Sequence, residues 1–146
     1  MDEKLKYSTE QIKKMLDSLG DASSEYTKKL TNADLNDDEI HRQCDFLRDS
    51  VIQRFEYTIE GFWKYLKTYL ISQGIHLAEQ TPRYIVRQSA LARLITENEA
   101  QLLLEMITER NKTSHIYQEE VADKLAHYAP TAFTLMKNIV SRLNKK

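Results

Sequence analysis

The sequence predicts an all-α protein, an up-and-down bundle of four or five helices. The 146 residues include three glycines and two prolines, and such a shortage of turn-forming residues favours long helices over many short strands. No segment shows the clear period-two alternation of a half-buried strand. Hydrophobic residues make up 41% of the chain and charged residues 29%, which is typical of a folded domain. The length predicts a single domain spanning residues 1–146.

The first predicted helix begins near Ser8 or Thr9, because either side chain can cap a helix N-terminus. It continues to about residue 30, where a polar stretch interrupts the pattern. Apolar residues recur along it at the three- and four-residue spacing of a helix face: Ile12, Met15, Leu16, Leu19, Tyr26 and Leu30.

The second predicted helix is very long and runs from about residue 37 to residue 73. Asn36 and Glu39 form a possible capping box at its start, and Gly74 is a natural stop. A helix of that span is about 55 Å long at 1.5 Å per residue, which suits a bundle or the spine of a homodimer. Its apolar stripe comprises Ile40, Cys44, Leu47, Val51, Phe55, Ile59, Phe62, Leu66 and Leu70.

Two shorter helices are predicted next, each with a clear start signal. Thr81-Pro82 begins the third helix, since proline at the first helical position gives up no hydrogen bond. Thr96 and Glu99 form a second capping box, at the start of the fourth helix.

The last predicted helix runs from about Gln118 to Leu143. Pro130 lies inside it and is expected to kink the helix or split it in two, because proline lacks the amide hydrogen and its ring crowds the preceding turn.

Charge and composition exclude several classes of function. The formal net charge of −1 argues against a broad, non-specific nucleic-acid surface, although a small local basic site remains compatible. The first residues lack the apolar run of a secretion signal, and no stretch approaches the ~20 apolar residues of a membrane span. We therefore expect a cytoplasmic protein without membrane association. Recognised metal, phosphate-loop and nucleophile motifs are also missing from the sequence, which predicts no metal and no cofactor.

One segment, residues 109–117, gathers side chains with chemical potential. Arginine offers a planar fork that matches phosphate oxygens, and histidine exchanges a proton near neutral pH. Together they suit cleavage of a phosphodiester, in which one group moves the proton of a ribose 2′-hydroxyl and the other stabilises charge at phosphorus. The candidate residues are Arg110, Asn111, Lys112, Ser114, His115 and Tyr117.

Helix geometry limits this interpretation. Arg110 and His115 point about 140° apart on an ideal helix, so they converge only if the helix breaks between them or if two copies meet across a dimer axis. An ordinary bundle also places arginine near a helix end, where the dipole favours it. From spacing alone, the purely structural explanation is favoured. Glu56, Glu60 and Trp63 have no assigned role, since such residues are usually solvated ion pairs or core.

The pattern Arg110-x4-His115-x-Tyr117, with Asn111 after the arginine, resembles the signature of HEPN-domain proteins. Residues 48–64 and 81–90 resemble corresponding segments of the nucleotidyltransferase substrate-binding family within that group. The segments occur in the same order as in that family, and the resemblance spans roughly residues 36–143.

The resemblance implies a helical bundle that forms a homodimer and binds a minimal nucleotidyltransferase. Two roles follow from it: a metal-independent ribonuclease toxin restrained by the nucleotidyltransferase, or a non-catalytic subunit that binds a nucleotide substrate. A purely structural interaction module is the third hypothesis. By matched position, the resemblance makes Arg110 and His115 catalytic with help from Asn111, and makes Tyr117 an acceptor of AMP. Lys112 and Ser114 would then contact the substrate, either RNA or a nucleotide. Where relatives often carry an acidic residue after the tyrosine, this chain has Gln118.

Overall fold

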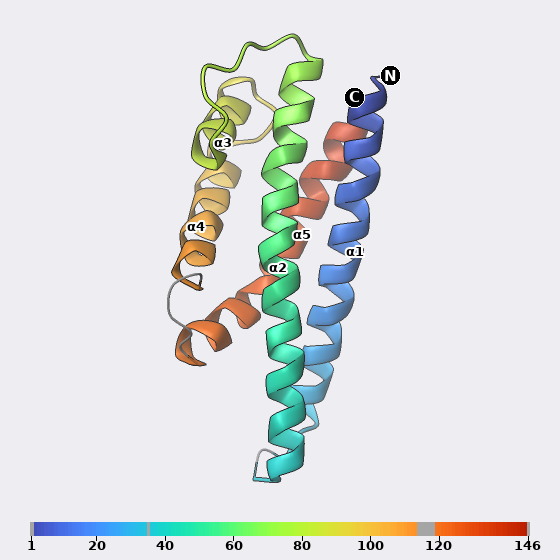
Figure 1. Cartoon of the computed structure of the whole chain (residues 1–146), viewed down its shortest axis with the longest axis vertical. Helices are drawn as coiled ribbons and strands as arrows, with labels where there is room; N and C mark the ends of the chain where they lie inside the picture. The colour runs from blue at the N-terminus through green and yellow to red at the C-terminus, as the bar shows by residue number, and fades with distance from the viewer. Residues whose placement is uncertain (1, 35, 114–118, 146) are drawn as a thin grey trace.

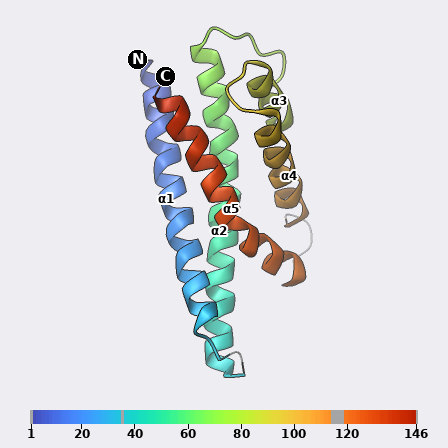
Figure 2. The same cartoon turned by 180° about the vertical axis from the view of Figure 1, so that it is seen from behind.

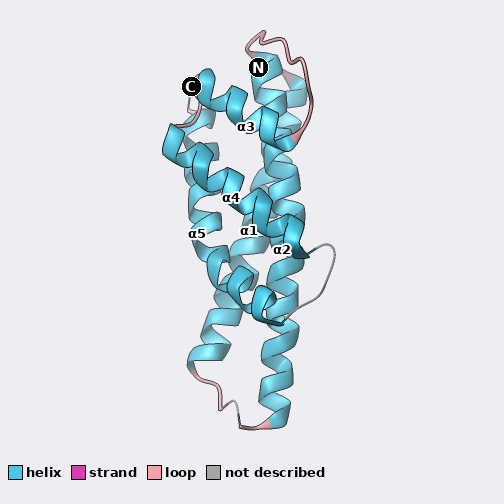
Figure 3. Ribbon diagram, turned by 90° about the vertical axis from the view of Figure 1, so that its left-hand side faces the viewer, coloured by secondary structure: helices cyan, strands magenta, loops and turns pink. Residues whose placement is uncertain are grey.

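The computed structural model describes residues 2–34, 36–113 and 119–145. Every regular element in these ranges is an α-helix, and no strand occurs within them (Figure 3). The predicted all-α class is therefore confirmed.

Three long helices form an elongated core, and two shorter ones pack against one side of it (Figure 1). The long helices are α1 (Glu3–Thr31), α2 (Asp38–Ser72) and α5 (Glu119–Asn144), and the shorter ones are α3 (Pro82–Leu91) and α4 (Glu97–Thr113). In Figure 1 the chain descends along α1, rises along α2, descends through α4 and rises again along α5. The two termini meet at one end of the bundle, as Figure 2 also shows.

Helix α1 begins earlier than predicted. Its N-cap is Asp2, whose carboxylate accepts a hydrogen bond of 2.9 Å from the Lys4 amide. The expectation that Ser8 or Thr9 caps this helix is wrong. Thr9 lies within the helix, where its hydroxyl donates to the carbonyl oxygen of Leu5 at 2.7 Å. A carboxylate is a strong cap, and it also complements the positive end of the helix dipole.

The start of α2 differs from the prediction by one residue. Asp37, rather than Asn36, is the N-cap, and its Oδ1 accepts from the amides of Glu39 at 3.0 Å and Ile40 at 3.2 Å. The predicted capping box at Asn36 and Glu39 is therefore wrong, because one carboxylate already satisfies two of the exposed amides.

The end of α2 agrees with the prediction. Gly74 has a φ angle of +79°, in the left-handed region that glycine adopts without steric cost. The amide of Ile75 then donates to the carbonyl oxygen of Leu70 at 3.1 Å, which closes the last turn of the helix.

Helices α3 and α4 begin as predicted. Thr81 is the N-cap of α3 and Pro82 occupies its first position. Thr96 and Glu99 make a reciprocal capping box, in which the Thr96 amide donates to Oε1 of Glu99 at 2.9 Å and the Glu99 amide donates to Oγ1 of Thr96 at 3.1 Å.

Helix α5 is one helix that bends along its length (Figures 1 and 2). Pro130 lies inside it, so the kink predicted from this proline occurs and the alternative, two separate helices, does not. The predicted start at Gln118 lies outside the described residues.

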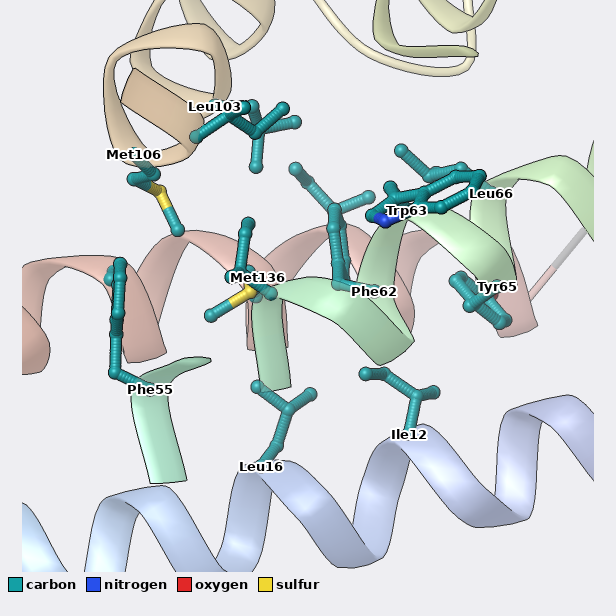
Figure 4. Packing of buried hydrophobic residues seen from close by; sticks show 14 of the residues in the cluster. Ile12, Leu16, Phe55, Phe62, Trp63, Tyr65, Leu66, Leu103, Met106 and Met136 are labelled. Atoms are coloured by element: carbon teal, nitrogen blue, oxygen red, sulfur yellow. The ribbon is translucent and has the colours of Figure 1, made fainter. Parts of the chain in front are cut away.

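The hydrophobic core fills the space between the long helices and continues beneath α3 and α4. Figure 4 shows aromatic and aliphatic side chains from several helices meeting around α2. Fully buried members include Phe55, Phe62, Tyr65, Leu66, Leu103, Met106 and Met136.

Gly61 marks a close approach between α1 and α2. A Cβ atom built at this position would overlap the sulfur atom of Met15. A glycine inside a helix ordinarily costs about 1 kcal/mol relative to alanine. The glycine leaves room here for the end of the Met15 side chain of α1.

Among the helices of residues 2–34, 36–113 and 119–145, none combines the length and apolarity that crossing a bilayer requires.

Candidate functional site

The structure describes part of the predicted site. Arg110, Asn111 and Lys112 lie in the last turn of α4. Ser114, His115 and Tyr117 lie outside the described residues, so the predicted pairing of Arg110 with His115 stays a prediction.

Arg110 contacts the long helix α2. Its Nη2 atom is 3.4 Å from Oε2 of Glu60, and the two side chains are 33% and 35% exposed. Glu60 is also bound on its own helix: Nε1 of Trp63 donates to it at 3.1 Å, and Nζ of Lys64 lies 3.3 Å from Oε1. Glu60 and Trp63 had no role in the sequence analysis, but Glu60 contacts Arg110 and Trp63 donates a hydrogen bond to Glu60.

The charge of Glu60 is stabilised by these neighbours. Burial alone would raise its pKa, but hydrogen bonds from Trp63 and Lys64, together with the charges of Lys64 and Arg110, lower the pKa below its ordinary value. Glu60 is therefore a carboxylate at neutral pH, an acceptor and counter-ion rather than a proton donor.

A pocket of about 180 Å³ opens beside this ion pair, where α2 meets the start of α3 and the end of α4. Two arginines and one glutamate line it, so its wall carries an excess of positive charge although the whole chain has a net charge of −1. The lining includes Glu60, Trp63, Pro82, Arg83, Arg110 and Asn111.

Arg83 is a site residue that sequence reasoning missed. It lies in the first turn of α3, and its Nη2 donates to Oγ1 of Thr108 on α4 at 2.7 Å. The available signal was its position directly after Thr81-Pro82, which places a cation at a helix start. Its convergence with Arg110 depends on tertiary packing, which that signal does not contain.

The chemistry that the described lining supports is anion binding. Arginine side chains donate several hydrogen bonds to oxygen anions, and Trp63 and Pro82 supply an apolar wall. Across the described residues, no group of three or more His, Cys, Asp or Glu side chains is placed to hold a metal ion.

The start of α5, which follows residues 114–118 in the chain, also contacts α2. Arg48 of α2 is buried, and its Nη1 lies 3.2 Å from Asp123 and 3.7 Å from Glu119, both at the start of α5. Two further carboxylates of α2, Asp45 at 3.4 Å and Asp49 at 3.2 Å, complete its surroundings. The end of α4 and the start of α5 are therefore both held on the same helix.

The fold and site together define a class: an all-helical bundle with an arginine-lined pocket where its longest helix meets a pair of short ones. The chain belongs to the family described as nucleotidyltransferase substrate binding protein like, whose model matches residues 7–145. This match includes most of α1, which the resemblance in the sequence had not covered.

Among solved structures, a protein of Thermus thermophilus is similar to this chain. The two are 31% identical, the alignment covers 86% of this chain and 98% of the other, and the TM-score is 0.63. No curated protein matches the chain.

Proposed function

We propose that this protein is the partner subunit of a minimal nucleotidyltransferase and that its own activity is metal-independent cleavage of RNA, as the toxin of a toxin–antitoxin pair. The observation that carries the proposal is the placement of Arg110. Glu60 holds its guanidinium at the pocket, a third exposed, and four residues of chain separate it from His115.

The chemistry divides between two residues. Arg110 stabilises the negative charge that develops at phosphorus, while His115 accepts the proton of the attacking ribose 2′-hydroxyl. The 2′-oxygen forms a bond to phosphorus as the bond from phosphorus to the 5′-oxygen of the next nucleotide breaks. That 5′-oxygen takes a proton from water, and the products are a 2′,3′-cyclic phosphate and a 5′-hydroxyl. Asn111 assists at the phosphate, and Lys112 and Ser114 contact the RNA. No step requires a metal ion.

The ion pair with Glu60 is compatible with this role. A guanidinium carries five N–H donors in a planar fork, and such a group can contact a carboxylate and a phosphate at the same time. Glu60 also fixes the orientation of the arginine, which reduces the entropy lost when the substrate binds.

Tyr117 is the proposed control point. Transfer of AMP from ATP to its hydroxyl by the partner, with release of pyrophosphate, would place a phosphate charge two residues from His115, where it would pair with Arg110 and exclude RNA. A homodimer would bring two Arg110–His115 sets together, and sedimentation analysis measures that state directly.

Cleavage of cellular RNA in EDTA tests the proposal. We expect the wild type to cleave, and Arg110→Ala and His115→Ala to lose cleavage. Arg87→Ala and His41→Ala are matched controls: both side chains are exposed, and neither lines the pocket. These controls should cleave like the wild type. If protein shown by mass spectrometry to lack AMP on Tyr117 cleaves no RNA, the ribonuclease proposal is wrong.

A non-catalytic, nucleotide-binding subunit is the second candidate. The pocket and the family description favour it. Expression in cells separates the two: growth arrest by the wild type but not by His115→Ala supports the toxin, and equal growth supports the binding subunit. Co-purification with the nucleotidyltransferase is expected under both hypotheses and contradicts a purely structural module.

A further inference from the structure

The pocket beside Arg110 contains a second arginine from another helix. Arg83 enters from the start of α3 and Arg110 from the end of α4, and both line the same space of about 180 Å³. The hydrogen bond from Arg83 to Thr108 joins α3 to α4 next to the pocket. The lining holds two cations from separate helices and one carboxylate, Glu60 of α2, so its formal charge is positive.

The start of α3 adds to this positive potential. Its first turn contains no acidic residue, and its N-cap Thr81 makes no side-chain capping bond. The amides of a helix start carry partial positive charge. The arginines define the pocket, and the helix strengthens the field that they create.

Apart from Thr81 and Asn111, the rest of the lining is apolar and aromatic. Trp63 and Pro82 line the pocket together with Ile59 and Ile107. A ligand with a charged end and a less polar body, such as a phosphorylated nucleoside, matches this division better than a bare inorganic anion does.

We propose that this pocket is a phosphoryl-binding subsite, in which Arg83 and Arg110 together hold the oxygens of a phosphate ester. The inference rests on the proposed function in so far as Arg110 belongs to both, and it adds Arg83 as a binding residue. The phosphate can come from a free nucleotide or from an RNA backbone, and the two sources share this chemistry.

Isothermal titration calorimetry of the full chain tests the subsite with defined probes: AMP, adenosine, inorganic phosphate and a 2′-O-methyl RNA tetranucleotide that resists cleavage. We expect AMP to bind at least about tenfold more tightly than adenosine, because the charge-assisted hydrogen bonds need the phosphate. Arg83→Gln and Arg110→Gln should each weaken AMP binding about tenfold. Arg83→Lys, which keeps the charge but loses the fork, should weaken it less.

Arg87→Gln is the matched control, because Arg87 is an exposed arginine one turn further along α3 that does not line the pocket. It should bind AMP like the wild type. Trp63 is the one tryptophan of the chain, so its fluorescence reports binding at this pocket. The fluorescence change should follow the calorimetric affinity in every variant, with circular dichroism confirming that each variant is folded.

The two sources give different results. Tighter binding of AMP than of the tetranucleotide supports a nucleotide subsite, and the reverse supports an RNA-backbone subsite. The inference is overturned if none of the phosphate probes binds, or if Arg83→Gln binds them as the wild type does.

The outcomes also separate this inference from the proposed function. Cleavage of RNA in EDTA with phosphate binding unaffected by Arg83→Gln would keep the ribonuclease and remove the subsite. Arg83-dependent binding without any cleavage would keep the subsite and remove the ribonuclease.

Discussion

Replacing Arg48 by methionine is expected to lower the free energy of unfolding by about 2 kcal/mol. The Arg48 side chain is 5% exposed and lies within 3.7 Å of four carboxylates, from Asp45, Asp49, Glu119 and Asp123. Breaking a fully buried ion pair costs about 3–5 kcal/mol, because a buried charge is left without its partner. Here the remaining carboxylates are between 32% and 67% exposed, so water can solvate them and the cost is smaller. Methionine retains most of the apolar packing of the arginine stem.

Thermal unfolding followed by circular dichroism measures this effect. For a chain of this size, about 2 kcal/mol corresponds to a fall in Tm of roughly 4–8 °C. Arg42→Met is the matched control, since Arg42 lies on the same helix, is exposed and pairs with Glu39; its Tm should change little. A double-mutant cycle with Asp123→Asn should give a coupling energy of about 0.5–3 kcal/mol. If Arg48→Met unfolds within about 1 °C of Arg42→Met, the reasoning about this cluster is refuted.

Two further predictions concern the packing of the bundle. Glu99→Gln keeps the capping geometry but removes the charge that pairs with Arg142 at 2.7 Å, so we expect a loss of about 1–2 kcal/mol at pH 7 in urea unfolding. Burial would raise the pKa of Glu99, but hydrogen bonds from Arg142 and Thr96 and the charge of Arg142 lower it below 4.5. The contribution is therefore complete above about pH 4.5 and disappears as the pH falls through the lowered pKa. A difference that stays constant from neutral pH down to the pH of acid unfolding would contradict this assignment. Gly61→Val should destabilise the protein by about 1–3 kcal/mol through overlap with Met15. Met15→Ala in the same chain should restore part of the lost stability. Equal Tm values for Gly61→Val with and without Met15→Ala would argue against this contact.

Much of the fold could be predicted because its signals are local. The long second helix, its stop at Gly74 and the starts at Thr81 and Thr96 each depend on residues within a few positions of one another. The starts of the first two helices were misplaced for a related reason. Ser8 and Asn36 are good caps, but stronger acceptors, Asp2 and Asp37, lie nearby and make the capping bonds.

The candidate site was predictable only in part. Arg110 was found because it belongs to a short pattern of reactive side chains. Glu60, Trp63 and Arg83 belong to no such pattern, and the packing of α2 and α3 against α4 brings them into the same pocket lining as Arg110. Periodicity identifies the face that each helix buries, but it does not identify which helix covers that face. The link from Arg48 to α5 was missed for the same reason.

The placement of the α3–α4 pair affects the fraction of molecules in solution that carry an assembled pocket. Within the described ranges, the pair contacts α2 and α5 but not α1, and the pocket takes side chains from both sides of the boundary with α2. Separation of the pair from α2 would dismantle the pocket while α1, α2 and α5 stay folded. The local opening free energy of this boundary, rather than the global stability, therefore sets the fraction of molecules that carry an assembled site. Amide hydrogen exchange that is faster in α4 than in the middle of α2 would give that fraction directly.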